Sequence, residues 1–266
     1  MEDTVFKQAS STFYPSSQLF PKDTRKDVFK LYSFVRIADD FVDSVPANKE
    51  AFLGLKKSWE GLSESSDPKI VLVVENIRYL TSKYGIKVEW VDSFLEVMQQ
   101  DLKLTQYKTL EDSLEYVYGS GEVVGLMMAK LLKLPDKATV AARLQGRAMQ
   151  WINFIRDIDE DNQLGRAYFP QEDLKKFGLD NLTRESAEAN PENFKKFIHF
   201  QIERYKHWQT EAEVGYKYIP KRLLVPVKTA RDMFNWTANQ IEKDPFIVFD
   251  KKVKLKKIPS YKSGYF

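Results

Sequence analysis

Apolar residues recur every three or four positions over most of this chain, rather than at every second position. This spacing places them on one face of a helix, whereas strict alternation would indicate strands. Only 11 of the 266 residues are glycine, and no stretch rich in proline, glycine and serine divides the chain. We therefore predict an all-α fold in a single domain over residues 1–266. The expected helices lie at about 21–45, 49–63, 68–84, 88–104, 110–134, 136–162, 191–218 and 221–243, with a short one that begins near Pro170.

The stretch 117–132 is apolar on nearly every side of its expected helix. A helix of this kind belongs at the centre of a bundle. It carries Gly119, Gly121 and Gly125, although each glycine reduces helix stability by up to about 1 kcal/mol. Two interpretations account for them: close packing against another helix, or space left free for a substrate chain.

Two pairs of aspartates lie in helical segments, Asp39 with Asp43 and Asp157 with Asp161. Residues four apart share one face of a helix at a separation of about 5–6 Å, so the two carboxylates of a pair could share a cation. The spacing alone is weak evidence, because the chain has 38 acidic residues and most such pairs are solvated helix faces.

The neighbours of the two pairs favour a functional site. An arginine precedes the first aspartate of each pair, Arg36 and Arg156, where a surface helix would more often offer lysines. Gln150 and Asn153 lie on the same face as the second pair. If the two faces meet across a cavity, their combined negative charge predicts a site for several divalent cations that bind a diphosphate.

The loop 162–170 follows directly on the second pair and carries Arg166 and Tyr168. Its position predicts a lid over the acidic site.

Composition excludes several other kinds of site. Cysteine is absent, which excludes disulfides, thiolate metal sites and cysteine nucleophiles and fits a reducing cytoplasm. The only histidines, His199 and His207, lie in an otherwise polar helix and are expected to be exposed, which disfavours a histidine-based zinc site or triad. The N-terminus lacks the features of a signal peptide, and no apolar run approaches the roughly 20 residues that cross a bilayer. We expect a cytoplasmic protein, soluble or peripherally associated with a membrane, and the pattern indicates no oligomeric state.

The C-terminal tail, residues 244–266, is locally basic. One interpretation is a solvated terminus, and the other is a weak electrostatic contact with anionic lipid. Nucleic-acid binding is not expected, because the net charge is only +3 and no aromatic residues are interleaved along a basic face. The basic residues of the tail are Lys251, Lys252, Lys254, Lys256, Lys257 and Lys262.

In their order and spacing, these motifs resemble the squalene/phytoene synthase family. The resemblance covers nearly the whole chain and rests on Tyr32 and on the segments 10–13, 36–43, 116–125, 150–161 and 165–170. It implies an isoprenoid-synthase fold, which is a helical bundle around a central apolar cavity with the two aspartate motifs facing each other at its mouth.

Site residues follow from the resemblance by position. It implies that Asp39, Asp43, Asp157 and Asp161 are catalytic and, together with Asn153, bind Mg²⁺, for which Mn²⁺ is an alternative. It also implies that the substrate diphosphate contacts Ser10, Ser11, Thr12, Tyr32, Arg36, Gln150, Arg156, Arg166, Tyr168 and Arg231.

The residue types fit such chemistry independently of the resemblance. An allylic diphosphate ionises when cationic groups neutralise the charge that develops on the leaving group, and this needs no protein nucleophile. The carbocation that remains must be shielded from water, and aromatic faces stabilise cations. The 18 phenylalanines and 13 tyrosines are sufficient to line a cavity, although most are expected to be ordinary core.

Within the family, the short chain without a C-terminal membrane anchor is most similar to prokaryotic phytoene synthases. The implied reaction joins two isoprenyl diphosphates, here geranylgeranyl diphosphates, head to head and forms phytoene through the cyclopropyl intermediate prephytoene diphosphate. The alternative is a squalene or dehydrosqualene synthase acting on farnesyl diphosphate, and only the squalene reaction would need NADPH. A non-catalytic helical scaffold of the same fold is a third interpretation, but it would be expected to lose the acids or their arginines.

Three positions depart from the family pattern. Ser11 stands where members often have lysine, and Met233 stands where some relatives have a tyrosine. Glu122 stands where many relatives have a small residue. It indicates a shifted helix register, a buried acid with satisfied partners, or a change in the wall of the pocket.

Overall fold

The structure is a computed structural model that describes residues 13–103, 106–253 and 255. Helices form most of the described part, and the only pairing of strand type in it is an isolated bridge between Gln106 and Ala167. The predicted all-α class is confirmed. The longer helices are α3 (Lys22–Asp43), α4 (Lys49–Trp59), α5 (Pro68–Tyr84), α6 (Val88–Gln100), α7 (Leu110–Val117), α8 (Val123–Leu131), α9 (Thr139–Arg156), α13 (Pro191–Glu213) and α14 (Lys221–Lys243).

Shorter elements complete the fold and account for most differences from the prediction. They are α2 (Phe13–Ser17), α10 (Ile158–Gln163), α11 (Gln171–Lys176), α12 (Arg184–Ala189), α15 (Ile247–Asp250), the π-helix η1 (Tyr118–Glu122) and the 3₁₀-helices η2 (Asp136–Ala138) and η3 (Val214–Tyr218). The predicted helix 110–134 contains the π-helix, and the predicted helix 136–162 is interrupted at Asp157. The helices α2, α12 and α15 were not predicted, because each has six residues or fewer and carries little periodic signal.

Local sequence accounts for several helix ends. Thr109 and Asp112 form a capping box at the start of α7, in which each side chain accepts a hydrogen bond from the backbone of the other. The side chain of Asn48 accepts a hydrogen bond from the backbone of Ala51 at the start of α4. Gly85 ends α5 in the left-handed conformation, with φ of 64°.

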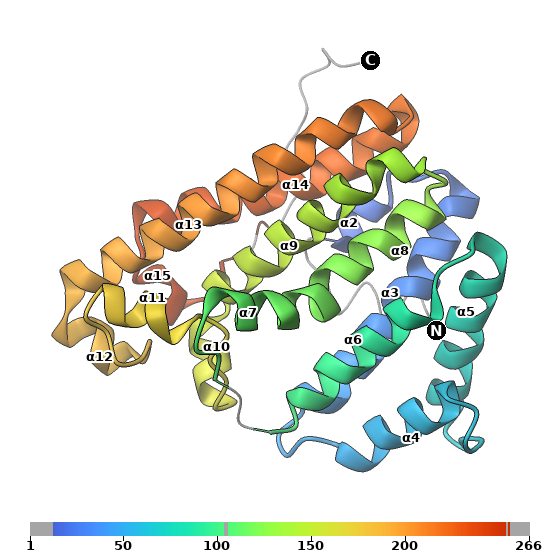
Figure 1. Cartoon of the computed structure of the whole chain (residues 1–266), viewed down its shortest axis with the longest axis horizontal. Coiled ribbons are helices and arrows are strands. Elements are labelled where there is room, and N and C mark those ends of the chain that lie inside the picture. The colour runs from blue at the N-terminus through green and yellow to red at the C-terminus, as the bar shows by residue number, and fades with distance from the viewer. Residues whose placement is uncertain (1–12, 104–105, 254, 256–266) are drawn as a thin grey trace.

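Helix α9 is the central element of the bundle. It packs against α8 on one side and α13 on the other, and α14 also contacts it. The helices α3, α5 and α6 pack together beside α8 (Figure 1). Trp151 of α9 is fully buried, and most of the large buried side chains belong to one cluster with members from Phe20 to Val253.

The glycines of the apolar stretch lie where two helices touch. A Cβ atom on Gly125 would lie 2.2 Å from the backbone oxygen of Ala142, and one on Gly121 would lie 2.7 Å from Cβ of Gln150. From the facing helix, a Cβ on Gly146 would lie 2.2 Å from the oxygen of Gly121. Close packing therefore explains these glycines, and the backbone that they expose also forms part of a cavity wall.

Glu122 is a buried acid with satisfied partners, which selects one of the three interpretations left open by the sequence. Its side chain is 1% exposed, and its two oxygens accept hydrogen bonds from Arg143 at 2.7 Å and Arg147 at 2.6 Å. The carboxylate lies in the π-helix and ties it to α9.

Among the described residues, no helix has both the length and the apolar composition needed to span a bilayer.

Candidate active site

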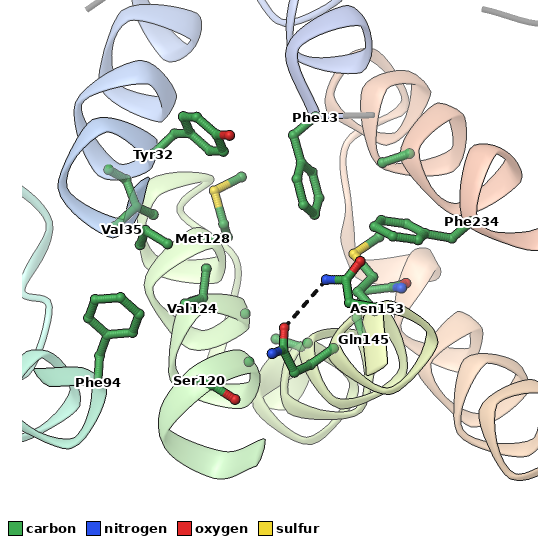
Figure 2. Close-up of a pocket in the computed structure, with 18 of the residues that line it drawn as sticks. Phe13, Tyr32, Val35, Phe94, Ser120, Val124, Met128, Gln145, Asn153 and Phe234 are labelled. Carbon is green, nitrogen blue, oxygen red and sulfur yellow. Dashed lines mark hydrogen bonds between the residues drawn. The ribbon is translucent and has the colours of Figure 1, made fainter. Parts of the chain in front are cut away.

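A cavity of about 510 Å³ lies at the centre of the bundle. Residues of α3, η1, α8, α9, α10 and α14 line it. Figure 2 shows Tyr32 of α3 and Phe234 of α14 on opposite sides of the cavity, with Val124 of α8 on the side of Tyr32. The volume falls in the usual range for a small-molecule site.

The first acidic face comes from one side of α3. Tyr32, Arg36, Asp39 and Asp43 all line the cavity, as their spacing along one helix face requires. Arg36 donates a hydrogen bond to Asp39 at 2.9 Å and forms an ion pair with Asp40 at 2.5 Å. The guanidinium therefore lies directly beside the first motif.

The second acidic face comes from the end of α9 and from α10. Helix α9 ends at Arg156, and Asp157 has φ of −101° and ψ of 15°. The backbone N–H of Asp161 nevertheless donates to the backbone oxygen of Asp157 at 2.8 Å, so the two aspartates keep the helical i, i+4 hydrogen bond although α9 ends at Arg156, before both of them. Arg156 donates two hydrogen bonds to Asp157, at 2.8 and 2.5 Å. Asn153 and Gln150 line the cavity one and two turns before Asp157, joined by a weak hydrogen bond of 3.4 Å.

Arg166 connects the two faces. It follows α10 in the chain, and its guanidinium, 7% exposed, forms an ion pair with Asp43 at 2.5 Å and donates to the backbone oxygen of Val42 at 2.8 Å. A contact across 123 positions of sequence thus holds the end of the second motif against the end of the first. The predicted lid loop is anchored on α3.

Burial and repulsion between carboxylates both raise pKa values where the two acidic faces meet. Burial raises the pKa of Asp39 to about 7, and the nearby Asp43 adds to the rise although Arg36 opposes it. Burial also raises the pKa of Asp161 well above its ordinary value, and Asp157 and Asp43 add to the rise. Because Asp43 belongs to the other helix, carboxylates of both motifs share one field.

Asp157 behaves differently from Asp161. Burial alone would raise its pKa, but the charge and hydrogen bonds of Arg156, with a further contribution from Lys252, leave it below its ordinary value. This carboxyl is therefore ionised over the physiological range.

The donor set fits a hard divalent cation. Mg²⁺ prefers oxygen ligands, and the aspartates with Asn153 offer only carboxylate and amide oxygens toward the cavity. Burial, and after it the neighbouring carboxylates, raises the pKa of Asp39 and of Asp161, so a bound cation would stabilise the charged form of both groups. Within the described ranges, no three carboxylate or histidine side chains are gathered closely enough to hold a metal ion.

Lys252 is a cavity residue that we did not predict. Its ammonium lies 3.3 Å from Asp157 and forms an ion pair with Glu160. The following residue, Val253, is buried. The two interpretations of the basic tail stay predictions, and neither anticipated the contact of Lys252 with the second motif, because a single lysine within a run of lysines carries no signal of where it points. Lys254, Lys256, Lys257 and Lys262 lie outside the described residues.

Asp101 is a second cavity residue absent from the predicted site. It lies at the C-terminal end of α6 and accepts hydrogen bonds from Tyr116 and Tyr168, which also line the cavity. A signal was present in the sequence: Asp101 continues the face of Phe94 and Met98, so it is an acid on an apolar stripe.

Arg231 and the N-terminal part of the predicted site are not among the described lining residues of the cavity. Arg231 pairs instead with Glu213 at 2.7 Å and with the adjacent Asp232 at 2.5 Å. The predicted diphosphate contacts Ser10, Ser11 and Thr12 lie outside the described residues. Both histidines are exposed, as predicted.

The comparison with protein families shows to which family the chain belongs. The model of the squalene/phytoene synthase family matches residues 6–258. The chain belongs to the squalene/phytoene synthase family.

The relatives of this chain within the family include two bacterial enzymes. It is 26% identical to the 15-cis-phytoene synthase of Synechococcus elongatus over 91% of this chain and 83% of the relative. It is 29% identical to the 15-cis-phytoene synthase of Enterobacter agglomerans over 85% of this chain and 79% of that enzyme.

Solved structures share its fold. A dehydrosqualene synthase in complex with a ligand superposes with a TM-score of 0.75 at 23% identity, over 91% of this chain and 85% of that one. The squalene synthase HpnC of Alicyclobacillus acidocaldarius also has a TM-score of 0.75, at 21% identity over 91% and 92% of the two chains. At these identities the likeness establishes the fold alone. By its family, the protein is a prenyltransferase that condenses isoprenyl diphosphates head to head.

Proposed function

We propose that this enzyme condenses two molecules of geranylgeranyl diphosphate to phytoene through prephytoene diphosphate, with Mg²⁺ bound by Asp39, Asp43, Asn153, Asp157 and Asp161. The observation that carries the proposal is the contact between Arg166 and Asp43, because it unites both acidic faces at one end of an apolar cavity. Bound Mg²⁺ would neutralise part of the charge on the departing diphosphate.

The basic side chains around the acids have a direct role in this proposal. Arg36, Arg156, Arg166 and Lys252 all line the cavity beside the acidic motifs. Cations fixed in these positions stabilise the negative charge that develops on diphosphate as its bond to carbon breaks, without having to reorganise at that moment. Their positive charge also orients the two substrates with their diphosphates at the same end of the cavity.

The remaining wall suits the isoprenyl chains. Its apolar lining excludes water from the allylic cation, and Phe154 and Tyr168 present aromatic rings close to the acidic end. Ala141 and Arg156 both line the cavity and are separated by about 22 Å of helix α9. This length favours geranylgeranyl over farnesyl, which is one isoprene unit shorter, and the curated relatives named above are phytoene synthases.

The test is identification of the hydrocarbon made by purified enzyme. The enzyme is incubated with Mg²⁺ and labelled geranylgeranyl or farnesyl diphosphate, each with and without NADPH. We expect phytoene from geranylgeranyl diphosphate, independent of NADPH. Preferential use of farnesyl diphosphate would instead establish a dehydrosqualene synthase, or a squalene synthase if the product requires NADPH. Binding of either diphosphate without turnover would indicate a non-catalytic scaffold.

A further inference from the structure

Asp101 combines several features that are costly for a carboxylate. It is 8% exposed, and it lies at the C-terminal end of α6, where the helix dipole disfavours negative charge. Burial raises its pKa to about 6, although Arg166 and the two phenols oppose the rise. A residue that conflicts with its local environment in this way is often retained for function.

Its two oxygens hold two phenols, one each. Tyr116 donates its proton to Oδ2 at 2.5 Å, and Tyr168 donates its proton to Oδ1 at 3.1 Å. The three residues come from the end of α6, from α7 and from the segment after Gly165, so the carboxylate joins three separate parts of the chain. A phenol has only one proton to donate, so each phenol that donates to Asp101 has only oxygen lone pairs left for the cavity.

The same tyrosines form an aromatic cluster next to the second acidic motif. Tyr168 stacks on Phe154 with ring centroids 4.5 Å apart and an angle of 10°, and the rings of Tyr116 and Tyr168 are 4.9 Å apart. Phe154 directly follows Asn153 and precedes Arg156 by two positions. The cluster therefore lies close to the diphosphate end of the cavity.

We propose that Asp101 is a positioning residue that turns the phenol protons of Tyr116 and Tyr168 away from the cavity. When the bond between C1 and the diphosphate oxygen breaks, its electron pair leaves with the diphosphate and an allylic cation remains. The phenol oxygens and ring faces then stabilise this cation, whereas a phenol proton pointing at it would repel it. The inference rests on the proposed function, because it requires an allylic diphosphate in this cavity.

A mutant cycle tests this role. Asp101→Asn keeps the shape of the side chain, but its amide group donates where the carboxylate accepted, so one phenol must turn its proton. We expect kcat to fall by about 30-fold with KM within about twofold, and a larger share of turnover to end as prenyl alcohol formed by water. Tyr116→Phe with Tyr168→Phe should show a similar loss. Adding Asp101→Asn to that double variant should cause no further loss, because no phenol remains to be oriented.

Tyr107→Phe is the matched control. Its ring belongs to the same aromatic cluster, 5.6 Å from Tyr116, but it lines a separate small pocket. Its kcat should stay within about twofold of the wild type, and thermal melts of all variants verify folding.

Four outcomes would overturn the inference. In the first, the losses of Asp101→Asn and of the double tyrosine variant multiply in the triple variant. In the second, Asp101→Asn raises the Mg²⁺ concentration needed for activity at unchanged kcat, as replacement of a metal ligand would. A fully active Asp101→Asn variant beside an active wild type would refute the positioning role alone. A wild type that makes no hydrocarbon from either diphosphate would refute the proposed function together with it.

Discussion

At the scale of residues, cations of the chain itself neutralise much of the acidic site. Asp39 pairs with Arg36, Asp43 with Arg166, and Asp157 with Arg156. Binding of divalent cations must compete with these ion pairs, and it would release the guanidiniums toward the diphosphate. The proposed site thus couples binding of the metal to presentation of the groups that hold the substrate.

Replacement of one motif aspartate should remove activity and leave the fold intact. Asp39→Asn or Asp157→Asn removes a metal-binding charge, and we expect kcat to fall by at least about 100-fold in the hydrocarbon assay. Asp39→Asn should not lower the melting temperature of the metal-free protein, because it removes a carboxyl group whose pKa burial raises.

Asp23→Asn is the control, because it lies on the same helix α3 with a side chain that is 94% exposed. Full activity of an enzyme with both Asp39→Asn and Asp157→Asn would contradict the assignment.

The cavity residues differ in how far sequence could predict them. The four motif aspartates and their arginines were predictable, because spacing along a helix fixes which side chains share a face. Lys252 was not predictable, since its contact with Asp157 depends on how the C-terminal segment folds back. The ion pairs of Arg231 with Glu213 and Asp232, which lie outside the described lining of the cavity, could not be predicted from the resemblance. The buried Glu122 could be interpreted only once Arg143 and Arg147 were located on the facing helix.

At the scale of elements, the close approach of η1 and α8 to α9 sets the width of the cavity. Backbone meets backbone at Gly121 and Gly146, and at Gly125 and Ala142. Sequence predicted a central apolar helix, but the π-helix at 118–122 depends on this tertiary packing. The break between α9 and α10 could not be predicted either, because no proline or glycine lies at that position in the sequence.

Gly146→Ala should destabilise the protein. The added Cβ would lie 2.2 Å from the oxygen of Gly121, so the two helices must move apart, at a cost of about 1–3 kcal/mol in the free energy of unfolding. Urea denaturation measures this cost.

Gly54→Ala on α4 provides the comparison, because its Cβ would lie 3.7 Å from Ile70, which is ordinary contact. This change should stabilise the protein by about 0.5–1 kcal/mol through helix propensity. Equal effects of both alanines would contradict close packing as the reason for the central glycines.

At the scale of the whole molecule, acids from several helices line one cavity within the hydrophobic core. The raised pKa values of Asp39, at about 7, and Asp101, at about 6, mean that the folded chain binds these protons more tightly than the unfolded chain does. The one-domain interpretation of residues 1–266 stays a prediction.

The metal-free protein should therefore lose stability as pH rises from about 4 toward 7. We expect Asp39 to account for a loss of about 1 kcal/mol in the free energy of unfolding, a small value because its side chain is 35% exposed and solvent screens its charge. Urea unfolding in a chelator at pH 5 and pH 8 measures the difference, which should be smaller in Asp39→Asn than in the wild type. An equal pH dependence in both proteins would show that Asp39 does not contribute.

The central claim is that both aspartate motifs act on the same cations. Diffraction data from crystals grown with Mn²⁺ and inorganic diphosphate, collected for anomalous scattering by manganese, test it most directly. We predict manganese peaks at the end of the cavity between Asp39 and Asp43 on one side and Asp157 and Asp161 on the other, with diphosphate bound to them. Manganese bound to only one motif, or only at the outer surface, would contradict the account.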